Sequence, residues 1–248
     1  MKALILAAGY ATRLRPLTDS IAKPLLPVGG RPMVDWIVDR IAETSADEIH
    51  LVTNARFAAD FERWAEDKDV QVHNDGTTSN DDRLGAIGDI DFVGLDDDLL
   101  TIASDNLFDY SLAEYETYWR TKGGSCIAVY DVGDPALAKK YGVIDVDEDD
   151  RVTSFVEKPE HPPTTLCATA TYLYRREDVA LVKTYLAEGN PPDQPGNYVA
   201  WLHKRAPVYA YRFPGEWYDI GDQVQLLEAD NRMRLRVGLP ERAEYSPS

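Results

Sequence analysis

Short apolar runs alternate with amphipathic segments along the first half of the chain. Residues 2–7 are almost all apolar, which is typical of a strand buried on both faces of a sheet. Between residues 33 and 42, apolar side chains recur at a spacing that predicts a helix. The alternation continues, with strands expected at 49–53, 70–73, 99–103 and 126–130 and helices at 57–65 and 111–121.

The second half of the chain has a different pattern. Residues 142–174 contain three strand-like runs with little helix between them, which predicts a small antiparallel insertion. A helix is expected at 176–188, a strand at 208–213 and a final helix at 222–236. Because strands and helices alternate elsewhere, we expect a single α/β domain over residues 1–248, with a mixed, mostly parallel sheet and helices on both faces.

The composition narrows the class of protein. Acidic residues outnumber basic ones by 43 to 26, giving a formal charge of −17, and so negative a surface disfavours binding to nucleic acid or anionic membranes. The chain shows no membrane-spanning stretch and no signal-peptide pattern, so we expect a cytoplasmic protein with Cys126 and Cys167 as reduced core residues. Aspartate exceeds glutamate and arginine exceeds lysine. A halophilic source and an ordinary acidic enzyme both fit this bias.

The segment after the first predicted strand reverses the charge balance. Between residues 10 and 32, four basic residues accompany one acidic residue. Residues 7–9 are small, so a ligand can approach the backbone N–H groups closely, and such groups can bind an anion. Ligands of open α/β sheets bind beyond the carboxyl ends of the strands. Since Asp105 follows another predicted strand, we expect it to face the same phosphate-binding site as this opening loop.

The opening loop is neither a P-loop nor a dinucleotide fingerprint, because both glycine patterns are absent. Instead, LAAGYATRLRPLT followed by KPLLPVGGRPM resembles the signature of sugar-1-phosphate nucleotidyltransferases, the family that includes glucose-1-phosphate thymidylyltransferase and uridylyltransferase. The resemblance covers nearly the whole chain and implies a Rossmann-like fold with the nucleotide at the opening loop. It continues through SDN at 104–106, YGVIDVD at 141–147, FVEKP at 155–159 and WYDIGD at 217–222.

The resemblance implies a reaction and assigns roles at the phosphates. The reaction joins a nucleoside triphosphate to a sugar 1-phosphate and releases pyrophosphate. Arg13 would contact the triphosphate and the leaving pyrophosphate, and Lys23 would lie near the α-phosphate. Asp105 and Asp219 would bind Mg²⁺, which takes one or two carboxylates together with substrate phosphates. Asp222, in contrast, fits the N-cap of the last helix.

On the acceptor side, the resemblance places Glu157 on the sugar hydroxyls and Lys158 on the acceptor phosphate, where Lys158 would act catalytically. Gly142 would let the sugar approach the backbone, with Tyr141 beside it. Thr169 lies in the strand where family members usually carry Asn-x-Gly. We therefore expect its hydroxyl to contact the substrate.

On the nucleotide side, Ala7, Ala8 and Gly9 are expected to contact the nucleotide. Asn80 stands five residues before Gly85, where the thymidylyl and uridylyl enzymes have Gln. Its amide can both donate to and accept from a base edge. We expect UTP or dTTP ahead of CTP.

Ala11 stands where the family usually has Gly, so a positive φ at this position would cost about 1 kcal/mol. Two other functions stay open. One is a cytidylyltransferase acting on a non-sugar alcohol phosphate such as phosphocholine. The other is a non-catalytic homologue that binds a nucleotide sugar and regulates a partner, although the residues whose loss would indicate it are all present. The expected partners are a nucleoside triphosphate and a phosphorylated small molecule, and a homo-oligomer is left open.

Overall fold

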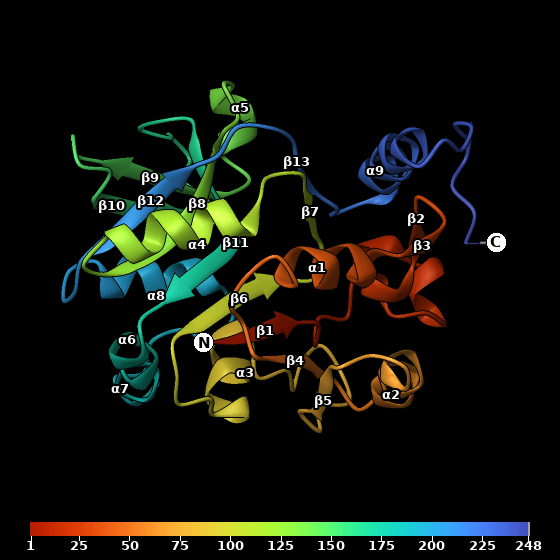
Figure 1. Ribbon diagram of the computed structural model, residues 1–248, viewed down its shortest axis with the longest axis horizontal. Coiled ribbons are helices and arrows are strands. Elements are labelled where there is room, and N and C mark those ends of the chain that lie inside the picture. The colour runs from red at the N-terminus through yellow and green to blue at the C-terminus, as the bar shows by residue number, and fades with distance from the viewer. Residues whose placement is uncertain (248) are drawn as a thin grey trace.

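A computed structural model describes residues 1–247, which form a sheet with helices on both faces (Figure 1). Within these residues the main sheet has nine strands. They are β1 (Lys2–Leu6), β4 (Glu48–Thr53), β5 (Gln71–Asn74), β6 (Leu99–Ala103), β8 (Ser125–Asp131), β9 (Gly142–Val146), β10 (Val152–Glu157), β11 (Leu166–Tyr174) and β12 (Val208–Arg212). Two short ribbons pair β2 (Pro27–Val28) with β3 (Arg31–Pro32) and β7 (Asn106–Phe108) with β13 (Trp217–Asp219).

The sheet is mixed and most of its strands point one way. The order is β10-β9-β11-β6-β1-β4-β5, and β8 pairs with both β11 and β12. β1 pairs in parallel with β4 and β6, whereas β11 runs antiparallel to β6, β8 and β9. The three antiparallel strands expected at 142–174 are β9, β10 and β11. The last of them is not peripheral, because it lies between β6 and β8 in the middle of the sheet.

Two hydrophobic cores cover the two faces of the sheet. Because successive side chains of a strand point to opposite faces, Ala3 and Ile5 of β1 enter one core, and Leu4 and Leu6 enter the other. The first core includes α1 (Met33–Ile41), α2 (Ala58–Ala65) and α4 (Leu112–Thr121). The second includes α3 (Ala86–Val93), α6 (Arg176–Ala180), α7 (Val182–Ala187) and α8 (Pro195–Leu202).

The last helix, α9 (Gln223–Arg236), packs on the opening loop rather than on the sheet. Leu226 and Met233 of this helix share a small core with Leu14 and Leu26 of the loop. The loop itself is stiffened by three single turns, η1 (Thr12–Leu14), η2 (Leu17–Asp19) and η3 (Lys23–Leu25). The segment that the sequence singles out for phosphate binding is therefore held between the sheet and the C-terminal helix.

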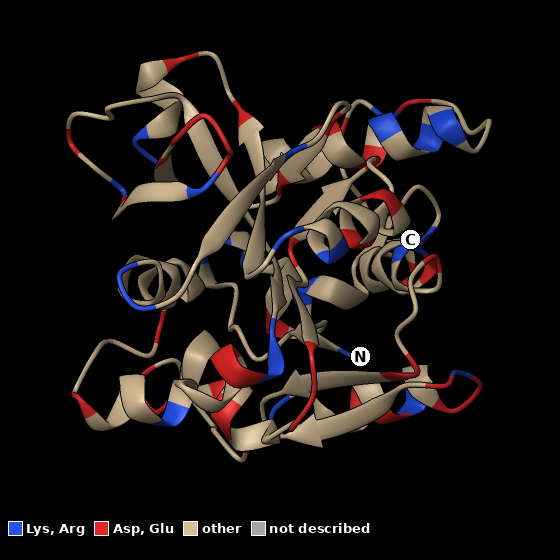
Figure 2. Ribbon diagram, turned by 60° about the vertical axis from the view of Figure 1, so that its left-hand side comes forward, with Lys and Arg blue, Asp and Glu red and all other residues tan. Residues whose placement is uncertain are grey.

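Most predicted elements are confirmed, and three helices were missed. The helix expected at 176–188 is split into α6 and α7. The missed helices are α3, α8, which begins in a Pro-rich segment typical of a loop, and the four-residue α5 (Pro135–Ala138). Both cysteines are buried and free, as expected. Within residues 1–247, no helix combines the length and the apolar character that a membrane crossing needs. Figure 2 shows acidic residues spread over loops and helices around the molecule rather than gathered on one element.

Candidate functional site

Three adjoining cavities lie at the carboxyl-end edge of the parallel strands. The larger cavity has a volume of about 660 Å³, the smaller cavity about 350 Å³ and the bridging cavity about 200 Å³. Asp105 lines all three. β1 and β6 pair in parallel, with Leu6 opposite Ala103, so the opening loop and Asp105 leave the sheet side by side. The opening loop and Asp105 line one cavity, as the sequence predicts, and the binding of phosphate there stays a prediction.

The opening loop offers backbone N–H groups to the smaller cavity. Ala8 is fixed by the buried Asn54, whose Nδ2 donates to the Ala8 carbonyl oxygen at 2.9 Å. Ala11 has φ 44° and ψ 44°, the left-handed conformation anticipated for this position, and Thr18 Oγ1 donates to its carbonyl oxygen at 2.9 Å. No hydrogen bond found in residues 1–247 uses the N–H of Gly9 or Tyr10. These groups are thus available to a ligand.

Lys23 and Asp105 form a partly buried ion pair where the smaller and bridging cavities meet. Lys23 Nζ lies 3.0 Å from Asp105 Oδ2, and the lysine side chain is only 9% exposed. Burial raises the pKa of Asp105, but the Lys23 ammonium and its hydrogen bond outweigh burial, so the pKa of this carboxyl is lowered overall. The carboxylate is therefore held ionised.

Asp219 is brought to Asp105 by the ribbon of β7 and β13. Asp219 is paired with Asn106 in this ribbon, and the N–H of the next residue, Ile220, donates to the Asp105 carbonyl oxygen at 3.0 Å. Burial and the negative charge of Asp105 raise the pKa of Asp219. Two carboxylates that disfavour each other's charge fit a hard divalent cation.

This donor set is small. No cluster of three or more His, Cys, Asp or Glu suited to a metal occurs in residues 1–247. Mg²⁺ is usually bound through one or two carboxylates plus substrate phosphates, and Asp105 and Asp219 match that requirement.

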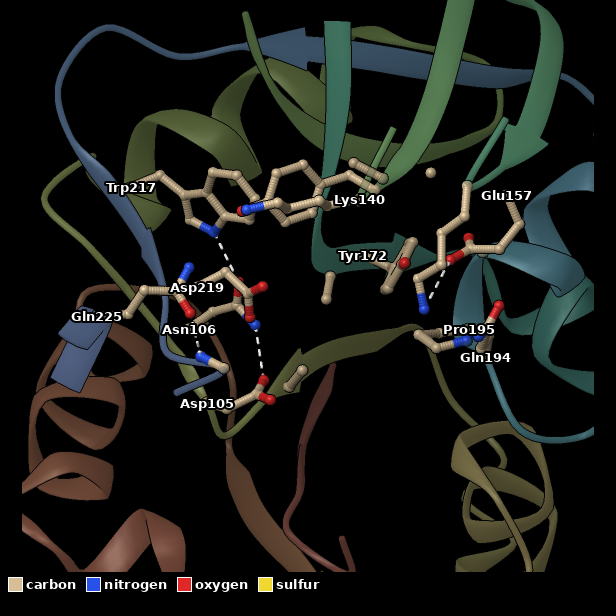
Figure 3. Close-up of a pocket in the computed structure, with 18 of the residues that line it drawn as sticks. Asp105, Asn106, Lys140, Glu157, Tyr172, Gln194, Pro195, Trp217, Asp219 and Gln225 are labelled. Carbon is tan, nitrogen blue, oxygen red and sulfur yellow. Dashed lines mark hydrogen bonds and ion pairs between the residues drawn. The ribbon is translucent and has the colours of Figure 1, made fainter. Parts of the chain in front are cut away.

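One wall of the larger cavity is aromatic (Figure 3). Trp217 Nε1 donates to Asn106 Oδ1 at 2.6 Å, and Asn106 Nδ2 donates to Asp105 Oδ1 at 2.8 Å. Tyr141 packs edge-on against Trp217 with ring centroids 4.9 Å apart. These contacts hold the Asp105 side chain in place from the side of the larger cavity. The sequence alone assigned no role to Asn106 or Trp217.

The opposite wall carries Glu157 and Gln194 (Figure 3). Lys158, the residue after Glu157, also lines the larger cavity. Lys158 Nζ lies 3.7 Å from Glu157 Oε1. With its amide turned to suit both neighbours, Gln194 donates to Glu157 Oε1 and accepts from Lys158 Nζ, each at 3.1 Å. Burial raises the pKa of Glu157, and Lys158 opposes that effect. Gln194 thus bridges the two residues that the sequence assigns to the acceptor.

One end of the smaller cavity is formed by the N-terminus of α3. The loop that precedes α8 covers this helix terminus. Ala86 N and Ile87 N donate to the carbonyl oxygens of Asp193 and Pro192 at 3.1 and 2.8 Å. Gly85 has φ 80°, and a Cβ there would lie 2.6 Å from the Asp193 Cα, so this close passage requires glycine. Arg83 Nε contacts Asp193 Oδ1 at 2.8 Å and ties the same two segments together.

The profile of the family described as Nucleotidyl transferase matches residues 2–235. The chain belongs to the nucleotidyl transferase family. A Bifunctional protein GlmU of Methanocaldococcus jannaschii is 27% identical over 96% of this chain and 55% of its own length. A UTP--glucose-1-phosphate uridylyltransferase of Synechocystis is 28% identical over 89% of this chain and 60% of its own length. The chain thus spans somewhat more than half the length of these curated relatives.

Solved structures confirm the fold of this nucleotidyl transferase. A putative glucose-1-phosphate thymidylyltransferase from Bacillus anthracis, solved in complex with a sucrose, superposes with a TM-score of 0.80. It is 25% identical, and the match covers 94% of this chain and 95% of that one. The single-domain α/β fold expected from the sequence is confirmed.

The structure brings nearly all of the sequence-predicted site residues of this nucleotidyl transferase to the three cavities. The residues at the smaller cavity are Ala7, Ala8, Gly9, Lys23, Asn80, Gly85 and Asp105. Those at the larger cavity are Arg13, Asp105, Tyr141, Gly142, Glu157, Lys158 and Asp219. Asp222 also reaches the larger cavity, and it caps α9 as expected, with Oδ1 accepting from Gln225 N at 2.9 Å.

The expectation for Thr169 needs correction. Thr169 is fully buried and donates to the Ala128 carbonyl oxygen at 2.9 Å, so its hydroxyl points away from the larger cavity. Alternate residues of a strand face opposite sides, and it is Ala168, Ala170 and Tyr172 that line the cavity. For Gly142 the structure adds a second reason for glycine, because a Cβ there would lie 2.4 Å from the Phe155 ring. Gly142 also lines the larger cavity, and the approach of a sugar to its backbone stays a prediction.

Sequence reasoning missed further lining residues, among them Asp89 at the smaller cavity and Lys140, Gln194 and Gln225 at the larger one. Lys140 directly precedes the quoted YGVIDVD motif, and Gln225 lies three residues beyond WYDIGD, so nearness to a motif could have pointed to both. Asp89 interrupts an otherwise apolar helical face that contains Ala86, Ile90 and Val93. That interruption was its signal.

Proposed function

We propose that this chain is a sugar-1-phosphate nucleotidyltransferase, which joins a nucleoside triphosphate to a sugar 1-phosphate and releases pyrophosphate. The observation that carries the proposal is the meeting of two substrate-sized cavities at Asp105, with Lys23 and Arg13 at the junction. A phosphoryl transfer needs positioning and neutralisation of charge more than covalent chemistry from the protein. A basic junction between two cavities meets that need.

In this proposal the nucleotide occupies the smaller cavity. The free N–H groups of Gly9 and Tyr10 donate to the phosphates, and Arg13 binds the departing pyrophosphate in the bridging cavity. Lys23 neutralises the α-phosphate while Asp105 holds its ammonium in place. The sugar phosphate oxygen attacks the α-phosphorus, and the bond to the β-phosphate oxygen breaks.

The acceptor occupies the larger cavity. Lys158 binds its phosphate, and Glu157 accepts hydrogen bonds from sugar hydroxyls, with Gln194 holding both side chains. The wall combines carboxylate, amide and ammonium groups, which suits a polyhydroxylated phosphate.

Mg²⁺ is part of the proposal, with Asp105 and Asp219 as its protein ligands. When bound, it would supply positive charge to the phosphates. We further propose UTP or dTTP as the nucleotide, on the strength of the amide at Asn80 near Gly85. The cytoplasmic location, the homo-oligomer and the halophilic source stay predictions from the sequence.

A pyrophosphate-release assay tests the proposal. The purified chain is incubated with Mg²⁺, each of UTP, dTTP, CTP, GTP and ATP, and each of several hexose 1-phosphates or phosphocholine. We expect release only when a triphosphate and a sugar 1-phosphate are both present. Release with phosphocholine alone among the acceptors would favour the alcohol-phosphate reaction, and no release with any pair would favour a non-catalytic binding protein.

A further inference from the structure

The smaller cavity contains a buried carboxyl group that the proposed reaction does not use. Asp89, in the first turn of α3, lines this cavity although only 4% of the residue is exposed. Its N–H donates to the Gly85 carbonyl oxygen at 2.8 Å, so it lies one helical turn after the glycine that borders the same cavity. Burying a carboxyl group is costly unless it has a partner. Its position therefore needs a physical reason.

The neighbour of Asp89 is a second carboxyl group, Asp75. Thr77 donates to Asp75 Oδ1 through its N–H at 2.7 Å and its hydroxyl at 2.8 Å, so this oxygen acts as an acceptor. Oδ2 of Asp75 and Oδ1 of Asp89 are buried, and no donor group in the described part of the chain bonds to either oxygen. Burial, the charge of Asp75 and a hydrogen bond with it raise the pKa of Asp89 to about 7.

Below a pH of about 7, Asp89 therefore carries a proton that it can donate to Asp75. A neutral carboxyl that donates in one direction keeps a carbonyl oxygen that can only accept. This oxygen is what Asp89 can present to a ligand in the smaller cavity.

We propose that Asp89 determines the base preference of the site, by accepting a hydrogen bond from the ring N–H of uracil or thymine. The inference deepens the proposed function and rests on it. Cytosine has a lone pair at that ring position, so two acceptors would face each other and one buried polar group would lose its partner. Buried sites of this kind reject the wrong ligand more strongly than exposed ones.

Asn80, the residue that the sequence favours for this role, is exposed. Water can replace a lost contact at an exposed amide, so Asn80 discriminates less than the buried Asp89. Both residues line the smaller cavity, and the comparison between them is open to measurement.

The test uses the full chain and two substitutions at Asp89. Asp89→Leu removes both carboxyl oxygens, with Asp89→Ala as a smaller alternative if leucine does not fit. Asp89→Asn keeps the shape, since its NH₂ group can donate to Asp75 while its carbonyl oxygen takes the accepting role. The same changes at Asp91 are the matched controls, because Asp91 lies on the same helix and lines none of the three cavities.

Two measurements are made on each variant: kcat and KM for UTP, dTTP, CTP, GTP and ATP, and calorimetric binding of UTP and CTP without acceptor. For Asp89→Leu we expect the preference for UTP over CTP to fall about tenfold, mainly through KM, which is the scale of one lost hydrogen bond. Asp89→Asn should keep the wild-type preference, and the Asp91 variants should match wild type throughout.

Several results would overturn the inference. They are a wild-type preference for CTP, an unchanged base preference in Asp89→Leu, or an Asp89→Asn variant that loses preference as the leucine variant does. If the wild-type chain turns over no triphosphate, the proposed function fails instead. In that case, the affinities of wild type and Asp89→Leu for UTP and CTP, measured by calorimetry, test the role of Asp89 independently of turnover.

Discussion

The smaller and larger cavities are built in different ways. The smaller cavity takes much of its wall from consecutive residues 6–11 and from the start of α3, and it presents backbone groups. The larger cavity collects side chains from separated segments, including β7, β9, β10, β11, the start of α8 and β13. A cavity wall made of consecutive residues can be recognised from a sequence motif. A wall made of residues far apart in the sequence depends on how the strands and helices pack together.

Two glycines show what this difference means physically. A Cβ at Gly9 in the smaller cavity would meet nothing within 4 Å, so the space beside it is free for a ligand. A Cβ at Gly142 in the larger cavity would lie 2.4 Å from the Phe155 Cζ and 3.0 Å from the Glu157 Oε2. The smaller cavity is thus open beside the Gly9 backbone, and the larger cavity is packed tightly behind Gly142.

The largest loss of activity is expected on substitution of Asp105 or Asp219, the two proposed ligands of Mg²⁺. Asp105→Asn and Asp219→Asn should lower kcat by about 10² to 10³, the scale of losing one electrostatic contact in a transition state. Steady-state kinetics at saturating Mg²⁺ measure this, with circular dichroism to check the fold. Asp134→Asn is the matched control, because Asp134 caps α5 and lines none of the three cavities, and asparagine caps a helix as well as aspartate does. Near-normal turnover in either of the first two variants would remove that residue from the metal site.

The same difference between the smaller and larger cavities explains which site residues could be predicted from the sequence. Ala7, Gly9, Lys23 and Asp105 were found because a long motif and the ends of parallel strands point to one edge. Gln194 was missed because its role depends on α8 closing against β10, and no local pattern encodes that contact.

Two strand details show the same limit. The side of β11 that faces the larger cavity was assigned wrongly, since a shift by one residue exchanges the two faces of a strand. The register of β11 is irregular between Ala168 and Tyr172, where Ala170 has φ 53°, and periodicity alone does not reveal such a bulge.

The next largest effects should distinguish the roles of Lys23 and Arg13, the two basic residues at the bridging cavity. Lys23→Ala should lower kcat by about 10² with little change in nucleotide KM, because it removes charge at the α-phosphate and leaves Asp105 without its partner. Arg13→Ala should chiefly raise nucleotide KM, because Arg13 is exposed and lines the bridging and larger cavities. Initial rates over a grid of both substrates distinguish the two patterns. Equal and mild effects would indicate a surface loop rather than a junction of two cavities.

A smaller effect tests the two glycines directly. Gly142→Ala should lower the free energy of unfolding by about 1–3 kcal/mol, the usual result of overpacking, and raise the acceptor KM. Gly9→Ala should leave stability near wild type and raise only the nucleotide KM, since its methyl group enters space meant for the ligand. Denaturant unfolding and steady-state kinetics on both variants measure this. If Gly9→Ala were the more destabilised of the two, the contrast between an open and a packed cavity would be wrong.

The smallest effect is a pH dependence confined to the smaller cavity. Burial and Asp75 raise the pKa of Asp89 to about 7, so the neutral form that can accept a base N–H while donating to Asp75 predominates below that pH. As the pH rises past 7, Asp89 ionises beside Asp75 and adds negative charge near the nucleotide, so the KM for UTP should increase severalfold while the acceptor KM stays level. The other titratable and charged residues lining this cavity are Tyr10, Lys23, Arg83, Asp105 and Asp193. The measurement is the ratio of UTP KM values in wild type and Asp89→Asn from pH 6 to 8.5, in which the titration of UTP itself cancels. The ratio should rise with pH, because asparagine does not ionise. A flat ratio would show that the charge of Asp89 does not reach the bound nucleotide.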